Sequence, residues 1–110
     1  MTRLVFVSGC VAIISLGLGF SAIAQSAADG EELYKKHCGG CHGLAGEKKA
    51  IDSKPLNQSS GDALAAMIKG YAEGSYGGKN KGIMLKVLGR ISPEELAAVV
   101  DHMKAHIALR

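Results

Sequence analysis

The sequence predicts an all-α fold, with three or four helices joined by glycine-rich loops. Three observations predict this class: apolar residues recur at helical spacing, helix-capping residues precede several of these segments, and no segment alternates apolar and polar residues as a strand would. The chain has 110 residues, which is enough for one small domain.

The first helix is expected to start at Asp29, a candidate N-cap, and to carry Leu33, Tyr34 and His37. The polar stretch 43–60 contains several glycines and one proline, so we expect a loop there.

A second helix is expected after Asp62, another candidate N-cap, with Leu64, Met67, Ile68 and Tyr71 along one face. The sequence Gly-Ser-Tyr-Gly-Gly at 74–78 should end it.

A short apolar stripe at 83–88 follows, and Gly89 is placed to close it as a C-cap. The last helix has the clearest start, because Ser92-Pro93-Glu94-Glu95 forms a capping box with proline at the first helical position. Its apolar face then holds Leu96, Val99, Val100, Met103 and Ile107.

The motif that carries chemistry is Cys38-Gly39-Gly40-Cys41-His42, which has the pattern C-x-x-C-H for attaching a c-type haem. Two thiols at this spacing can add to the two vinyl groups of one porphyrin edge. The histidine that follows can then bind the iron. A thioredoxin-like dithiol is disfavoured, because the sequence has no βαβ pattern. A zinc site is disfavoured as well, because it needs more Cys or His ligands at suitable spacing, for which His37 is the candidate.

The N-terminal 24 residues have the pattern of a secretory signal peptide. Arg3 is followed by an apolar run and by Ala22-Ile23-Ala24, an A-x-A cleavage site. A retained membrane anchor and a lipoprotein signal at Cys10 are the alternatives. Cleavage leaves residues 25–110 as one domain with 12 basic and 10 acidic residues. This near balance argues against a nucleic-acid partner, and both remaining cysteines belong to the motif.

A second axial ligand for the iron is expected to be a methionine, because the His/Met pair is common in cytochromes c and raises the potential. Met84 is favoured because it follows a glycine-rich stretch able to fold across the haem. Met67 and Met103 are better explained as core residues. His102 is the runner-up, as the second ligand of a bis-histidine site.

The chain resembles the small class I monohaem cytochromes c of the cytochrome c-553 type, over nearly all of residues 25–110. The resemblance is carried by Asp29-Gly30-x-x-Leu33-Tyr34-Lys35, the Cys38–Gly43 motif, Lys54-Pro55, Lys69-Gly70-Tyr71-Ala72-x-Gly74-Ser75-Tyr76-Gly77-Gly78, Lys81-x-x-Met84 and Ser92-x-Glu94-Glu95-Leu96.

This resemblance implies a class I cytochrome c fold wrapped around one haem c, attached through Cys38 and Cys41 and ligated by His42 and Met84. It implies that the carbonyl of Pro55 accepts a hydrogen bond from the proximal histidine, and that Tyr71 and Tyr76 pack near the haem edge. Gly30 and Tyr34 match the point where the first helix crosses the last. His102 stands where the family often has an aromatic residue, so that contact is expected to differ here.

The function predicted is a periplasmic one-electron carrier, not an enzyme, and a monomer by default. Its expected partners are exported or membrane-bound dehydrogenases, reductases and oxidases, with no stable membrane insertion after signal cleavage. Six lysines are candidates for a basic rim that steers acidic partners: Lys35, Lys36, Lys48, Lys49, Lys79 and Lys81. The alternative is a module that binds or senses carbon monoxide or nitric oxide at an open distal site.

Overall fold

The computed structural model describes residues 22–109, so nearly all of the predicted signal peptide lies outside the described residues. Within this range the chain is helical and has no strand, which confirms the all-α prediction. The helices are α1 (Ala22–His37), α2 (Gly39–His42), α3 (Gly61–Glu73), α4 (Lys81–Leu88) and α5 (Pro93–His102). A 3-10 turn (Leu56–Gln58) precedes α3, and a π-helical turn (Met103–Ile107) extends α5.

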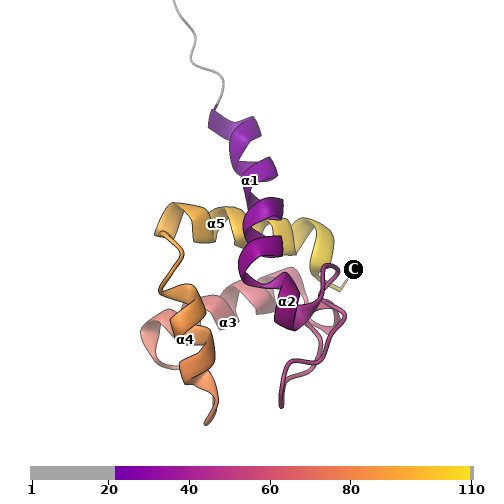
Figure 1. Cartoon of the computed structure of the whole chain (residues 1–110). Coiled ribbons are helices and arrows are strands. Elements are labelled where there is room, and N and C mark those ends of the chain that lie inside the picture. Colours follow the sequence, from indigo (N-terminus) through magenta and orange to yellow (C-terminus); the bar gives the residue numbers. More distant parts are fainter. Residues whose placement is uncertain (1–21, 110) are drawn as a thin grey trace, which may run out of the picture.

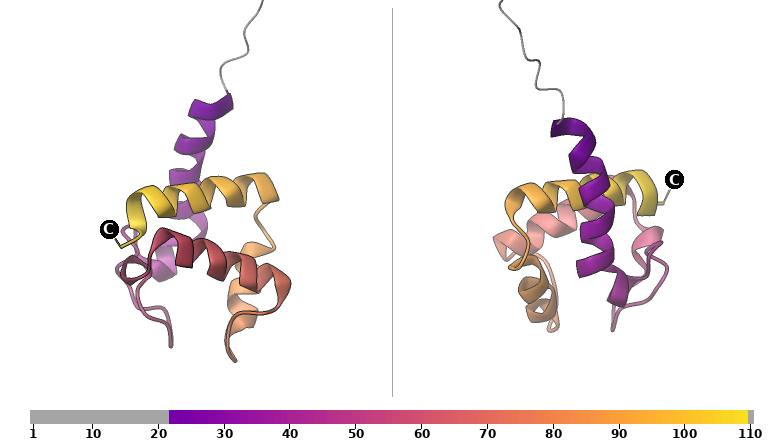
Figure 2. Two further views of the ribbon diagram at one scale, coloured as in Figure 1. Left: turned by 180° about the vertical axis from the view of Figure 1, so that it is seen from behind. Right: turned by 45° about the horizontal axis from the view of Figure 1, so that its top comes forward.

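Helices α1 and α5 cross each other, and α3 lies on the other side of α5 (Figures 1 and 2). The crossing is close because Gly30 of α1 faces the carbonyl of Ala98, which any Cβ at position 30 would strike. One turn further along α1, Tyr34 is fully buried. Its ring lies 5.4 Å from the imidazole of His102, centroid to centroid. The contact between the two helices therefore differs as expected, because the ring on α5 is the imidazole of His102.

The apolar core lies between α1, α3 and α5. It is formed by Tyr34, Leu64, Val99, Met103, Ile107 and Ala108. The C-terminal end is held to this core, because the Leu109 amide donates to the Ser59 carbonyl at 2.9 Å and Lys104 pairs with Asp62 at 3.4 Å. The predicted apolar face of the last helix thus continues through the π-helical turn.

Helix α4 is attached more loosely. It has no buried residue, and it packs against α3 on the side of the molecule away from α2 (Figure 1). Loops containing Gly77 and Gly78 lead into it, and Gly77 has a φ of 101°, which favours glycine. Gly89 ends α4 as predicted, with its amide donating to the carbonyl of Leu85.

Two predicted helix starts are wrong and one is confirmed. Helix α1 begins at Ala22, so Asp29 lies inside it. Helix α3 is capped by Ser60, whose hydroxyl accepts from the amide of Ala63, and Asp62 lies in the first turn. Ser92 caps α5 as predicted, accepting from the amide of Glu95.

No helix within residues 22–109 has the length and apolar character to cross a membrane.

Candidate functional site

A cavity of about 940 Å³ opens between α2, α3, α4 and α5. This volume is at the upper end of the range for cofactor sites, roughly 300–1,000 Å³. The cavity wall is mostly apolar and includes Leu64, Ile68, Val87, Leu88, Leu96 and Val99. A small domain that leaves so large a space between its helices is built around something that fills it.

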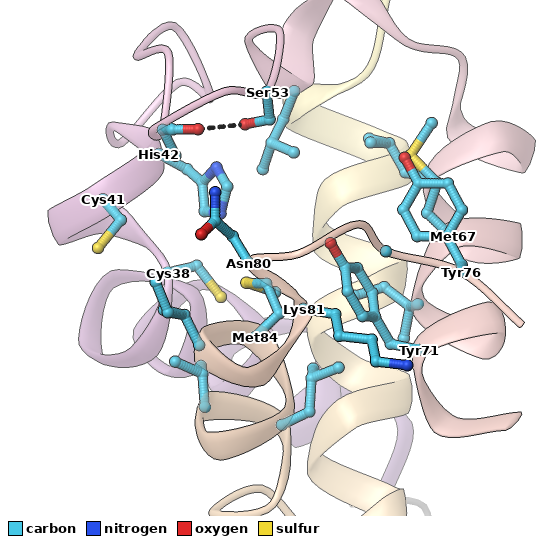
Figure 3. A pocket seen from close by; sticks show the side chains of 18 of the residues that line it. Cys38, Cys41, His42, Ser53, Met67, Tyr71, Tyr76, Asn80, Lys81 and Met84 are labelled. Atoms are coloured by element: carbon cyan, nitrogen blue, oxygen red, sulfur yellow. Dashed lines mark hydrogen bonds between the residues drawn. The ribbon is translucent and has the colours of Figure 1, made fainter. Parts of the chain in front are cut away.

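Helix α2 brings the motif to this wall. It is a single turn, in which the amide of His42 donates to the carbonyl of Cys38 at 2.9 Å and that of Gly43 to Gly39. Gly39 is buried, and a Cβ there would lie 3.0 Å from the side chain of Leu44. The turn places the thiols of Cys38 and Cys41 and the imidazole of His42 together at the cavity (Figure 3).

Both thiols are free. Burial, with the neighbouring Cys41 as a second cause, raises the pKa of Cys38 to about 11. Cys38 is half-buried and Cys41 is exposed. Both thiols line the same apolar cavity, and two thiols at this spacing suit addition to the two vinyl groups of a porphyrin.

Burial lowers the pKa of His42, so its imidazole is held neutral with a nitrogen lone pair available for a metal. Its Nδ1 atom is buried and has no hydrogen-bond partner among the described residues. The predicted bond from His42 to Pro55 is therefore not formed here, and the Pro55 carbonyl accepts from the Gln58 amide in the 3-10 turn at 3.2 Å. Pro55 is also not part of the cavity wall. Its bond to His42 stays a prediction for the haem-loaded protein.

Met84, on α4, is half-buried and faces the cavity from a different element than His42 (Figure 3). Met67 of α3 and Met103 also reach the wall, but Met103 is 3% exposed and belongs to the core. His102 is not part of the cavity wall and packs against Tyr34, so this structure does not support the bis-histidine alternative.

Tyr71 and Tyr76 both line the cavity, as expected (Figure 3). Their rings meet edge to face, with centroids 5.1 Å apart and planes at 83°. Burial, with Tyr76 as a second cause, raises the pKa of Tyr71. The pair is held by the end of α3, where the amides of Ser75 and Tyr76 both donate to the carbonyl of Gly70.

Sequence reasoning missed two features of the cavity mouth. Lys54 lines it, and Asn80 donates from Nδ2 to Oδ2 of Asp52 at 3.1 Å. An asparagine before a helix is normally interpreted as an N-cap, and Asp52 lies in a loop without periodicity. No signal in the sequence could therefore have paired them.

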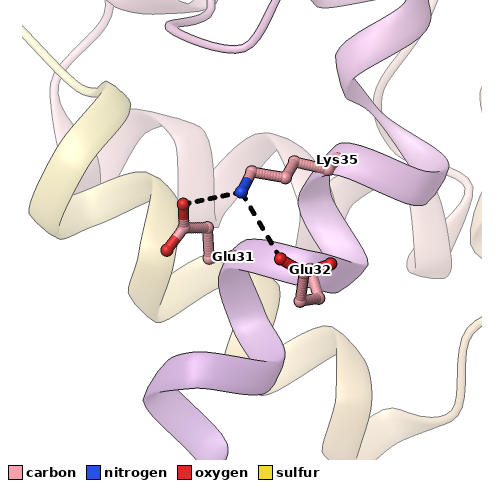
Figure 4. Close-up of polar contacts among 3 residues, drawn as sticks. All are labelled: Glu31, Glu32 and Lys35. Carbon is pink, nitrogen blue, oxygen red and sulfur yellow. Dashed lines mark hydrogen bonds and ion pairs between the residues drawn. The ribbon is translucent and has the colours of Figure 1, made fainter.

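The predicted basic rim is only partly formed. Of the six candidate lysines, Lys49, Lys79 and Lys81 line the cavity, whereas Lys36 and Lys48 are exposed away from its wall. Lys35 pairs with Glu31 at 2.9 Å and with Glu32 at 3.4 Å on the outer face of α1 (Figure 4). Its charge is therefore already matched by neighbouring carboxylates.

The donors at the cavity fit haem. An imidazole and a thioether are the axial pair that cytochromes c use, and two thiols are available for the covalent bonds. Zinc is not supported, because the described residues contain no group of three or more His, Cys, Asp or Glu side chains able to hold a metal.

The comparisons with known proteins identify the family of the chain. Residues 27–106 match the family model for cytochrome c. The chain is 43% identical over 91 residues to cytochrome c-553 of Nitratidesulfovibrio vulgaris (strain Miyazaki F), covering 82% of this chain and 88% of that protein. It is 35% identical over 74 residues to cytochrome c-553 of Desulfomicrobium norvegicum, covering 67% and 91% respectively.

The fold and the site define a small haem protein of class I. The chain belongs to the cytochrome c family, as a member of the cytochrome c-553 type. It carries a covalently bound haem c, with Cys38 and Cys41 at the attachment positions, and it is an electron carrier.

Proposed function

We propose that this chain is a periplasmic one-electron carrier whose haem iron is held by His42 and Met84. The observation that supports it best is that the two attachment cysteines, His42 and Met84 all lie on the wall of one apolar cavity. When bound, haem supplies a one-electron ferric/ferrous couple.

The two side chains proposed as ligands have different tasks. His42 is neutral because burial lowers its pKa, so its imidazole can bind iron without first losing a proton. Met84 offers a soft, uncharged sulfur, which favours ferrous over ferric iron and raises the reduction potential. If His42 and Met84 both hold the iron, substrates would be kept off the metal, and the chain would act as a carrier and not as an enzyme.

The cavity mouth is the proposed docking surface for redox partners. Lys49, Lys54, Lys79 and Lys81 line the cavity, and so do Ile51 and Ile83, which are exposed apolar side chains. Lysines of this kind attract acidic partners and speed their encounter, with an effect that salt weakens. We propose that these partners are exported or membrane-bound dehydrogenases, reductases and oxidases.

The place of action follows from the N-terminal sequence. Residues 1–24 have the charged start, apolar run and A-x-A site of a cleaved signal peptide. N-terminal sequencing of the mature, exported protein should give Gln25 as its first residue.

Replacing Met84 tests the ligand assignment. In Met84→Ala haem should stay attached, the potential should fall, and the ferrous iron should bind carbon monoxide. The absorption spectrum of the reduced protein, before and after carbon monoxide, measures this. Met67→Ala is the matched control, because Met67 lines the same cavity from α3 and should leave the spectrum unchanged.

The same measurement separates the second candidate function, a module that binds carbon monoxide or nitric oxide. If the unmodified protein already shifted its spectrum with carbon monoxide, the distal site would be open and the sensor function would replace the carrier.

A further inference from the structure

The two loops that border the cavity mouth are joined by one side-chain contact. The 43–55 loop follows the haem-attachment motif, and the 74–80 loop leads into α4. Asn80 donates from Nδ2 to Oδ2 of Asp52 at 3.1 Å, across 28 residues of sequence. Among the described residues, no other hydrogen bond or ion pair links these two loops.

Asn80 is at the N-cap of α4, yet its side chain makes no capping hydrogen bond. Asparagine is among the best N-cap residues, because its side-chain oxygen normally accepts from an amide of the first turn. Here the amide group reaches instead to a carboxylate in the other loop. A hydrogen bond with an ionised acceptor is stronger than one between neutral groups.

Helix α4 has little else to fix its start. None of its residues is buried, α3 is the helix it packs against, and Gly77, Gly78 and Gly82 surround Asn80. Met84 lies four residues after Asn80, one helical turn away, so a displacement of Asn80 carries Met84 with it.

We propose that the Asp52–Asn80 hydrogen bond is a positioning contact that holds the start of α4 against the 43–55 loop and thereby keeps Met84 on the haem iron. This rests on the proposed ligand role of Met84. Without the contact, the glycine-rich loop opens more often, Met84 leaves the iron for a larger fraction of the time, and external ligands enter.

The test uses the haem-loaded protein with Asp52→Ala, Asn80→Ala and the double variant. Each single variant should increase the rate of carbon monoxide binding to the ferrous protein about 2- to 10-fold, the range expected for one lost hydrogen bond. The double variant should bind no faster than the faster single variant, because both substitutions remove the same contact. Asn80→Asp should have the largest effect, since it places two carboxylates together.

Trypsin gives a second measurement that does not involve the iron. Lys79 and Lys81 flank Asn80 and are exposed, so more frequent opening of the loop should speed cleavage at these two sites by a similar factor. Ser53→Ala is the matched control: Ser53 is adjacent to Asp52, but its hydroxyl donates to the Ala50 carbonyl within its own loop at 2.6 Å. It should change neither rate.

Unchanged carbon monoxide binding and cleavage in both single variants would overturn the proposal, as would effects that add fully in the double variant. Met84→Ala separates this failure from that of the ligand assignment. If Met84→Ala opens the iron while Asp52→Ala and Asn80→Ala do not, only the positioning role fails. If Met84→Ala leaves the iron closed, the ligand assignment itself is wrong.

Discussion

The crossing of α1 with α5 and the attachment of α4 are two regions of one small domain that are held by different means. At the crossing, Tyr34 and Val99 are almost completely excluded from solvent, and Gly30 lets the two backbones touch. Helix α4 buries no residue and faces the cavity with Met84, Val87 and Leu88. Protein contacts fix the first region, whereas we expect haem to complete the packing of the second.

The largest effect is expected from removing haem attachment. A Cys38→Ser/Cys41→Ser double variant should be exported without forming a stable fold, because about 940 Å³ of its interior would be left without partner atoms. Circular dichroism and protease sensitivity would measure this. A helical, protease-resistant apoprotein would show that the core between α1, α3 and α5 suffices by itself.

Gly30→Ala should break the first region. The added Cβ meets the Ala98 carbonyl, so the helices must move apart, and we expect the free energy of unfolding to fall by about 1–3 kcal/mol. Denaturant titration of the haem-loaded protein measures this change. Full stability in this variant would mean that the crossing can relax at no cost.

Gly82→Ala should strengthen the second region. A Cβ at Gly82 meets no atom within 4 Å, and alanine favours the helix, so the free energy of unfolding should rise by about 0.5 kcal/mol. Carbon monoxide binding should slow in parallel if α4 controls access to the iron. Gly30→Ala and Gly82→Ala are the same chemical change, so opposite signs would establish the contrast between the two regions directly.

The smallest effect concerns pH at the crossing. Burial, followed by repulsion from His106, lowers the pKa of His102 below its ordinary value of 6.5, although the Glu31 carboxylate acts in the opposite direction. The unfolded chain then binds more protons than the folded one. His102 therefore contributes stability above pH 6.5 that is lost as the pH falls. In His102→Phe the melting temperature should depend less steeply on pH below 6.5. An unchanged pH dependence would mean that other groups cause the loss of stability.

The sequence predicted those parts of the fold that local signals specify. Ser92-Pro93 marked the start of α5, and the C-x-x-C-H pattern marked the site. Ser60 and Asp62 are both good capping residues two positions apart, and only the packing of neighbouring segments decides between them. Asp29 was misassigned because α1 extends into a segment without apolar periodicity. Helix α2 is a single turn, too short to show any period.

In the site, too, local sequence signals predicted some features and tertiary packing decides others. Cys38, Cys41, His42, Met84, Tyr71 and Tyr76 all reach the cavity as their positions suggested, because each is placed by a helix or its end. The hydrogen bond from Asn80 to Asp52 joins two loops, and the ring contact of His102 with Tyr34 replaces an aromatic pair. The resemblance pointed to the second contact, but the first depends on tertiary geometry that no local pattern encodes.

The hydroxyl of Tyr34 donates to the carbonyl of Gly43 at 2.8 Å, and Gly43 directly follows His42. The backbone beside the proposed proximal ligand is thus anchored to the interior of α1, whereas the opposite wall belongs to a separate stretch of chain. A protein engineer could therefore exchange residues 74–89 as one segment to tune the reduction potential or the access of ligands to the iron. The hydrogen bond that anchors the backbone beside His42 would stay unchanged.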